Sequence, residues 1–120
     1  METIWLPLRN DMVTITKAQN RAIFRAIADP PRREILNLLR EGPQAVGEIA
    51  GNFRISRPAI SRHLRLLKSA GLVVARQRGT TNICALKAQP LSAVNDWLGD
   101  YQAFWKDTLR DLKRYIEEDR

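Results

Sequence analysis

Acidic residues are missing from the middle of this 120-residue chain. No Asp or Glu occurs from Ile49 to Asn95, although the whole chain contains 13 of them. The same stretch holds eight of the 20 Lys and Arg residues. A solubilising surface normally mixes both signs of charge, whereas an unbalanced basic block is typical of proteins that bind nucleic acid. The charge distribution therefore favours a polyanionic partner.

Cysteine and histidine each occur once, as Cys84 and His63. A single cysteine excludes an intramolecular disulfide and is typical of a reducing compartment, which predicts a cytoplasmic location. Zinc and thiophilic metals need three or four suitable ligands, so we expect no metal site and no cofactor. Cys84 is interpreted as a small buried hydrophobe, and His63 as a core histidine bonded to the backbone.

Long apolar runs, a secretory signal and catalytic motifs are also absent. No run of about 18 apolar residues exists, so no membrane-spanning helix is predicted. The N-terminus lacks the basic start and apolar core of a signal peptide. No nucleophile–base pair or glycine-rich phosphate loop is found, which argues against an enzyme. The length and the 44% hydrophobic content predict one folded domain.

Helix start and stop signals predict the order helix, helix, helix, helix, hairpin, helix. The caps and breaks are Thr16, Asp29 with two prolines, Gly42-Pro43, Ser56 with Pro58, Gly71, the turn Gly79-Thr80-Thr81, and Pro90. They bound helices over 17–28, 32–41, 45–53, 57–70 and from 90 onward, with β-rich runs over 72–78 and 82–88.

The helix predicted over 57–70 separates its side chains into a polar arc about 140° wide at 100° per residue and a complementary apolar arc of similar width. The apolar arc contains Ala59, Ile60, His63, Leu64, Leu66, Leu67 and Ala70. The polar arc contains Arg57, Pro58, Ser61, Arg62, Arg65, Lys68 and Ser69. Arginine pairs with the O6 and N7 of guanine, and a helix in the major groove reads bases near its N-terminus. We therefore expect Arg57, Pro58, Ser61 and Arg62 to meet base edges, and Arg65 and Lys68 to meet phosphates.

The segments around this helix complete a winged helix-turn-helix. The helix at 45–53 is the supporting helix, Arg54 lies in the turn, and Ser56 caps the helix that follows. Arg76 and Arg78 precede the tip of the hairpin, which then forms a basic wing over the backbone or minor groove of flanking DNA.

The runs ISRPAISRHLRLLKSAGLV, ARQRGTTNICALK and FRAIADPPRREILNLL resemble the ArsR/SmtB family of small winged-helix regulators, over about residues 17–118. The resemblance implies a homodimeric transcriptional regulator, usually a repressor, whose first and last helices build the dimer. The metal-sensing cysteines and histidines of that family are absent from the supporting helix and the last helix, so the effector stays unknown and a metal is not expected.

The last helix carries apolar residues at heptad spacing and a second apolar line on another face, which predicts contact with another chain. With one residue of the first helix, the expected dimer interface is Ile23, Leu91, Val94, Leu98, Tyr101, Trp105 and Leu112. The aromatic residues of this helix either serve only in hydrophobic packing or line a small-molecule pocket. We divide the chain into an extension over 1–15, which adds a dimer arm or is partly disordered, and a domain over 16–120 with a dimerisation helix over 90–118.

The leading hypothesis is thus a sequence-specific regulator of double-stranded DNA, most simply a dimeric repressor that occludes a palindromic operator. The alternative is an architectural or RNA-binding winged-helix protein with no fixed target sequence. A third hypothesis is a winged-helix scaffold that binds another protein. That role would not require the exposed face of the helix over 57–70 to be so uniformly basic. Charge alone does not separate the first two.

Overall fold

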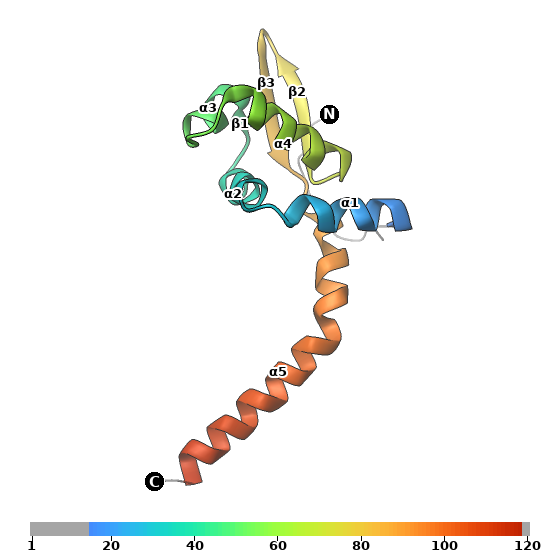
Figure 1. The fold of residues 1–120 in the computed structure, drawn as a ribbon, viewed down its shortest axis with the longest axis vertical. Coiled ribbons are helices and arrows are strands. Elements are labelled where there is room, and N and C mark those ends of the chain that lie inside the picture. Colours follow the sequence, from blue (N-terminus) through green and yellow to red (C-terminus); the bar gives the residue numbers. More distant parts are fainter. Residues whose placement is uncertain (1–14, 119–120) are drawn as a thin grey trace.

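The computed structural model describes residues 15–118. The predicted dimer arm falls almost entirely outside the described residues and stays a prediction. The elements are α1 (Lys17–Ile27), α2 (Pro30–Leu39), β1 (Gln44–Ala45), α3 (Val46–Gly51), α4 (Arg57–Ser69), β2 (Val73–Arg78), β3 (Thr81–Leu86), a 3-10 turn η2 (Gln89–Leu91) and α5 (Ser92–Glu118) (Figure 1).

The helix caps confirm the predicted order of elements. The Thr16 hydroxyl oxygen accepts the Gln19 amide at 3.0 Å, and the Ser56 hydroxyl oxygen accepts the Ala59 amide at 3.2 Å. Each cap satisfies a donor that the first helical turn leaves unpaired. Most predicted boundaries are displaced by one or two residues; α2, for example, begins at Pro30 and not at residue 32. In addition, α3 is shorter than 45–53, and Pro90 lies in η2 instead of the first turn of α5.

The hairpin belongs to a three-stranded antiparallel sheet in the order β1-β3-β2. β2 and β3 pair from Val73 with Leu86 to Arg78 with Thr81. The third strand, β1, places Gln44 opposite Cys84 on the other edge of β3. A two-residue strand is too short to show alternation of polar and apolar residues, so it could not be predicted from the sequence. Its role is to hold the start of α3 beside the hairpin.

The core lies where α1, α2, α3, α4 and the sheet meet. Its fully buried large side chains are Ile23, Ile35, Ile49, Ile60, Leu64, Leu67, Leu72 and Cys84. Ile23 was expected at a dimer interface, and that expectation is wrong, because the side chain has no exposed surface left for a partner to contact. Its spacing on α1 turns it inward, between α2 and α4.

α5 leaves the body of the molecule and projects far from it (Figure 1), so that the described residues span 64 Å along the longest axis. Among the predicted interface residues of η2 and α5, Leu91 and Val94 pack against the core and Leu98 is half-buried. Tyr101, Trp105 and Leu112 are 47–52% exposed.

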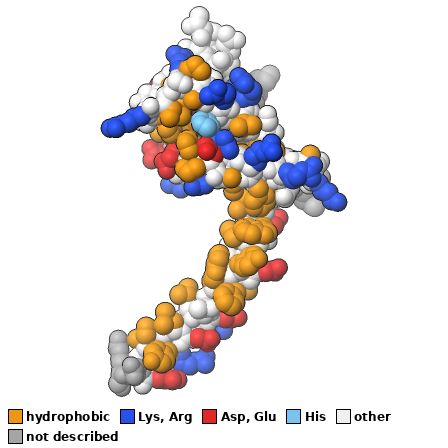
Figure 2. All heavy atoms as spheres, viewed as in Figure 1, with side chains coloured by type: hydrophobic (Ala, Val, Ile, Leu, Met, Phe, Trp, Pro, Cys, Tyr) orange, Lys and Arg blue, Asp and Glu red, His pale blue; other side chains and the backbone are white. Residues whose placement is uncertain are grey.

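The two apolar lines expected on α5 are one broad stripe. Its eight exposed large apolar residues, from Trp97 to Ile116, fall within an arc of about 140° at 100° per residue. Apolar side chains run along the whole projecting helix in Figure 2. Trp97 contacts Phe24 of α1 edge-on at 5.8 Å between ring centres, and Tyr101 and Trp105 continue the row. Within the described residues, no helix is long and apolar enough to cross a membrane.

The turn between α4 and β2 requires Gly71, whose φ is +79°. A side chain at this φ is strained, and a Cβ there would lie 3.1 Å from the Gln19 side-chain nitrogen. We expect Gly71→Ala to lower the free energy of unfolding by about 1–2 kcal/mol, measured by chemical denaturation. The matched control is Gly47→Ala in α3, where a Cβ meets nothing within 4 Å and where stability should rise by about 0.5–1 kcal/mol. An equal effect of the two substitutions would contradict this account.

Candidate nucleic-acid interface

One face of α4 packs in the core, and the opposite face is exposed to solvent. Ile60, Leu64 and Leu67 are buried on the inner face, where α4 contacts α1, α2, α3 and β2. Pro58, Arg62 and Arg65 are exposed on the outer face. Because the helix is clamped from several sides, its outer face has a fixed orientation. Figure 2 shows several Lys and Arg side chains over this part of the molecule, with apolar side chains between them.

A groove separates α4 from the wing. It has a volume of about 510 Å³ and is lined from α4 by Arg57, Ser61, Leu64 and Lys68. Its other wall is the start of α3 and the wing tip Thr80, Thr81 and Asn82. The groove thus joins three of the predicted DNA-binding side chains to the wing.

The ten predicted DNA-binding residues lie on three consecutive segments. Arg54 is in the turn before α4, Ser56 is the cap of α4, and Arg76 and Arg78 are on β2. Among the ten, only Ser61 and Arg76 are half-buried, and the others are exposed. Their roles toward DNA stay predictions.

Three side chains at the wing tip line the groove as well, although they were not predicted to bind DNA: Thr80, Thr81 and Asn82. Their hydroxyl and amide groups can bond to phosphate oxygens, and the run Gly-Thr-Thr-Asn at a predicted turn was the available signal. Leu66, expected in the apolar arc, is 40% exposed. It faces Ala18, Ala22 and Ala26 of α1, whose side chains are too small to cover it.

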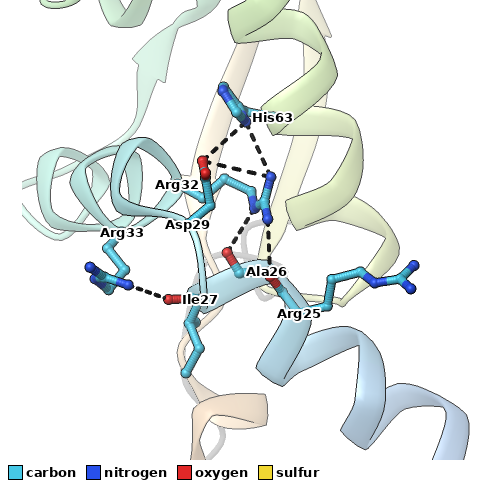
Figure 3. Close-up of polar contacts among 7 residues, drawn as sticks. All are labelled: Arg25, Ala26, Ile27, Asp29, Arg32, Arg33 and His63. Carbon is cyan, nitrogen blue, oxygen red and sulfur yellow. Dashed lines mark hydrogen bonds and ion pairs between the residues drawn. The ribbon is translucent and has the colours of Figure 1, made fainter.

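His63 contacts the side chains of Asp29 and Arg32 and not backbone groups (Figure 3). We call these three residues the Arg32 bracket. The Nδ1 atom of His63 is 3.3 Å from Nη1 of Arg32 and 3.7 Å from Oδ2 of Asp29. The side chain is 20% exposed, so His63 is half-buried at the edge of the core and not inside it. Its partners are two side chains from the start of α2. The expected bond to the backbone is wrong.

Arg32 is the centre of this bracket. Its Nε donates to the Ala26 carbonyl at 2.8 Å and its Nη2 to the Arg25 carbonyl at 3.0 Å, both at the C-terminal end of α1. Its Nη1 faces Asp29 at 3.7 Å, whose buried Oδ2 accepts no hydrogen bond from the described residues. One guanidinium therefore ties the end of α1 to the start of α2 and to α4. A cation at a helix C-terminus is favourable because the last carbonyls carry partial negative charge.

Cys84 lies in the middle of β3 and is fully buried. Burial raises the pKa of its thiol, and the nearby Lys68 ammonium opposes part of that rise. The thiol is therefore protonated at neutral pH, which suits a packing role better than a reactive one. Within the described residues, no group of three or more His, Cys, Asp or Glu side chains is placed to hold a metal ion.

A supporting helix, a turn, an exposed basic helix and a β-hairpin define a winged helix-turn-helix. The family profile described as bacterial regulatory protein, arsR family, matches residues 29–74. The HTH-type transcriptional regulator Rv2034 of Mycobacterium tuberculosis (strain ATCC 25618 / H37Rv) is 38% identical over 96 residues, which are 80% of this chain and 87% of that protein. The chain therefore belongs to the ArsR family of bacterial regulatory proteins.

Other relatives agree in function and fold. The transcriptional repressor SdpR of Bacillus subtilis (strain 168) is 40% identical over 76 residues, covering 63% of this chain and 84% of SdpR. The crystal structure of the ArsR family transcriptional regulator RHA00566 matches with a TM-score of 0.68 at 33% identity, covering 78% of this chain and 97% of the other. The homodimeric winged helix-turn-helix DNA-binding domain of Mb0332 from Mycobacterium bovis matches with a TM-score of 0.57 at 31% identity, covering 78% and 84%.

We expect Arg32→Ala to lower the free energy of unfolding by about 2–3 kcal/mol, because it leaves a buried carboxylate oxygen and two helix-end carbonyls without their cation. Arg33→Ala is the matched control, since within the described residues the exposed Arg33 side chain makes one hydrogen bond, to the Ile27 carbonyl at 2.7 Å. The control should lose less than about 1 kcal/mol. Urea denaturation of both variants tests this, and equal losses would show that the bracket contributes nothing beyond one surface hydrogen bond.

The Cys84 thiol predicts a pH dependence of stability. Its pKa is raised above the ordinary value of 9.0 in the folded state. The unfolded chain therefore loses this proton first as pH rises, so the stability linked to the thiol is complete below pH 9 and falls above it. Above about pH 9 the free energy of unfolding should fall more steeply with pH in the unchanged protein than in Cys84→Ala. Parallel curves would refute the assignment.

Proposed function

We propose that this protein is a sequence-specific DNA-binding repressor that occupies a two-fold symmetric operator as a dimer. The observation that carries the proposal is the outer face of α4, which is basic and acid-free while its inner face is locked in the core. Membership of a family of DNA-binding regulators supports the same reading, and SdpR, a relative, is named a repressor.

The start of α4 is the part suited to reading bases. Arg57, Ser61 and Arg62 lie on its first turns, where a helix that enters the major groove presents side chains to base edges. Arginine forms two hydrogen bonds with guanine, which no other base offers in that arrangement. Pro58 adds an apolar surface on the same face.

The remaining predicted contacts suit the phosphate backbone. Arg65 and Lys68 lie farther along α4, and Arg54 lies in the turn before it. The Ser56 hydroxyl oxygen accepts the Ala59 amide in the cap of α4, and the same hydroxyl group can still donate its proton to a phosphate oxygen. Arg76 and Arg78 on β2 place positive charge beside the groove along the wing. Such contacts set affinity and register without reading sequence.

The apolar stripe on α5 supports a dimer. Tyr101, Trp105 and Leu112 are half-exposed on a helix that the body of its own chain does not cover. A monomer rarely exposes so large an apolar surface, and the related Mb0332 domain is homodimeric. Two-fold symmetry would place two α4 helices about one turn of DNA apart, or about 34–36 Å. The operator should then be a palindrome.

The deciding experiment is selection of bound fragments from random duplex DNA, at physiological salt and with excess competitor DNA to suppress nonspecific binding. Recovery of a palindrome with half-sites about one turn apart supports a dimeric, sequence-specific regulator. Binding without any enriched motif, which fades as salt rises, supports an architectural protein instead. Placing the selected operator over a promoter then tests repression directly, by transcription in vitro.

We expect Arg57→Ala to lose about 1–3 kcal/mol of discrimination at one base pair in each half-site. Its affinity for unrelated duplex should change far less than its affinity for the operator. Arg110→Ala is the control, because Arg110 is an exposed arginine far along α5. Titrations with the operator and with single-base variants measure the effect. If Arg57→Ala weakens every duplex by one common factor, Arg57 is a phosphate contact and not a base-reading residue.

A further inference from the structure

A second groove runs along the opposite side of α4 from the wing. It lies between α4 and α1 and has a volume of about 290 Å³. Its floor consists of Ala18, Ala22, Ala26 and Leu66, with Ser69 beside them. Arg21 and Arg25 line it from α1. The outer face of α4 is therefore a ridge between two grooves, one toward the wing and one toward α1.

Both rims of this second groove are basic. On α4 the exposed Arg62 lies one turn before Leu66, which lines the groove. On the α1 side, Lys17, Arg21 and Arg25 are exposed at successive turns. α1 contains no acidic residue, and none of its three cations forms an ion pair within the described part of the chain. Figure 2 shows Lys and Arg side chains gathered over the region of α1 and α4.

Among the residues that the structure describes, the side chains of Arg21 and Arg25 form no hydrogen bond or ion pair. Figure 3 shows the Arg25 side chain pointing away from the bracket, which uses only the Arg25 carbonyl. Arg21 lines the groove toward α4 and a second depression beside Ile15. Arg21 and Arg25 repel each other because no acidic side chain lines the groove beside them. A partner that supplies negative charge removes this unfavourable electrostatic energy.

Duplex DNA has the shape and the charge for both grooves at once. The major groove is about 12 Å wide and a helix with its side chains is about 10–12 Å across, so a helix that fills it has a phosphate strand on each side. With α4 in the major groove, one strand passes over the groove toward the wing. The other strand then passes over the groove toward α1.

We propose that Arg21 and Arg25 bind the phosphate backbone of the operator strand that lies on the α1 side of α4. The inference rests on the proposed DNA-binding function and extends its surface to a helix outside the acid-free central block. The small side chains of Ala18, Ala22 and Ala26 keep the floor low, so a sugar-phosphate strand can approach between the arginines of α1 and those of α4.

The test is the salt dependence of DNA affinity for Arg21→Gln, Arg25→Gln and the double variant. Each lost phosphate contact lowers the slope of log affinity against log salt by about 0.9. In a dimer each substitution counts twice, so the slope should fall by about 1.8 for each arginine. The loss of affinity should be the same factor on the operator and on an unrelated duplex, because phosphate contacts carry no sequence information.

Arg110→Gln together with Arg114→Gln is the matched control, since both residues are exposed arginines at successive turns of α5. The control should keep the unchanged slope. Sedimentation of every variant without DNA reports the dimer, and circular dichroism reports the fold.

An unchanged slope for the α1 variants, with operator binding intact, overturns this inference and leaves the proposed function standing. Dissociation of the α1 variants into monomers also overturns it, because the arginines then hold the partner protomer, for example along Asp96, Asp100 and Asp111 of its α5. If the unchanged protein and the control bind no duplex above background, the proposed function fails and the inference fails with it.

Discussion

The burial of one face of α4 is the constraint on which the rest of the structure depends. Ile60, Leu64 and Leu67 are almost fully removed from water in the space where α1, α2, α3 and the sheet converge. Burying three such side chains contributes about 1.5–3 kcal/mol each, which is a large share of the stability of a domain of this size. No rotation of α4 keeps that burial, so the helix has one orientation and its basic face has one direction.

The Arg32 bracket adds a polar constraint to this apolar one. The Arg32 guanidinium bonds to carbonyls at the end of α1 and to His63 of α4. It therefore connects α4 to α1, the helix that contacts α5 through Phe24 and Trp97. Apolar packing tolerates small sliding movements, whereas a fork of directed hydrogen bonds does not. The Arg32 side chain therefore links the position of α1 to that of α4, in addition to the direct packing of the two helices.

The sequence predicted most of the fold because its start and stop signals are local. Thr16, Ser56 and Gly71 act within one turn of the chain, and the arcs of α4 follow from helical geometry. What it did not predict depends on distant pairings. β1 exists only because β3 is beside it, and the partner of His63 lies 31 residues away at Arg32. Ile23 and Leu66 were misplaced for the same reason, since the size of the neighbouring side chains on another helix decides which apolar residue is covered.

The lack of acidic residues within α4 and the wing has a consequence for the stability of the folded protein. Most surfaces neutralise their cations internally, but here the opposite charges are left to be supplied by another molecule. Without them the cations repel one another across α4 and the wing, and the folded state bears that unfavourable energy. Any polyanion that binds the folded chain shifts the equilibrium away from unfolding. A molecule whose basic surface is occupied is therefore harder to unfold than an unoccupied one.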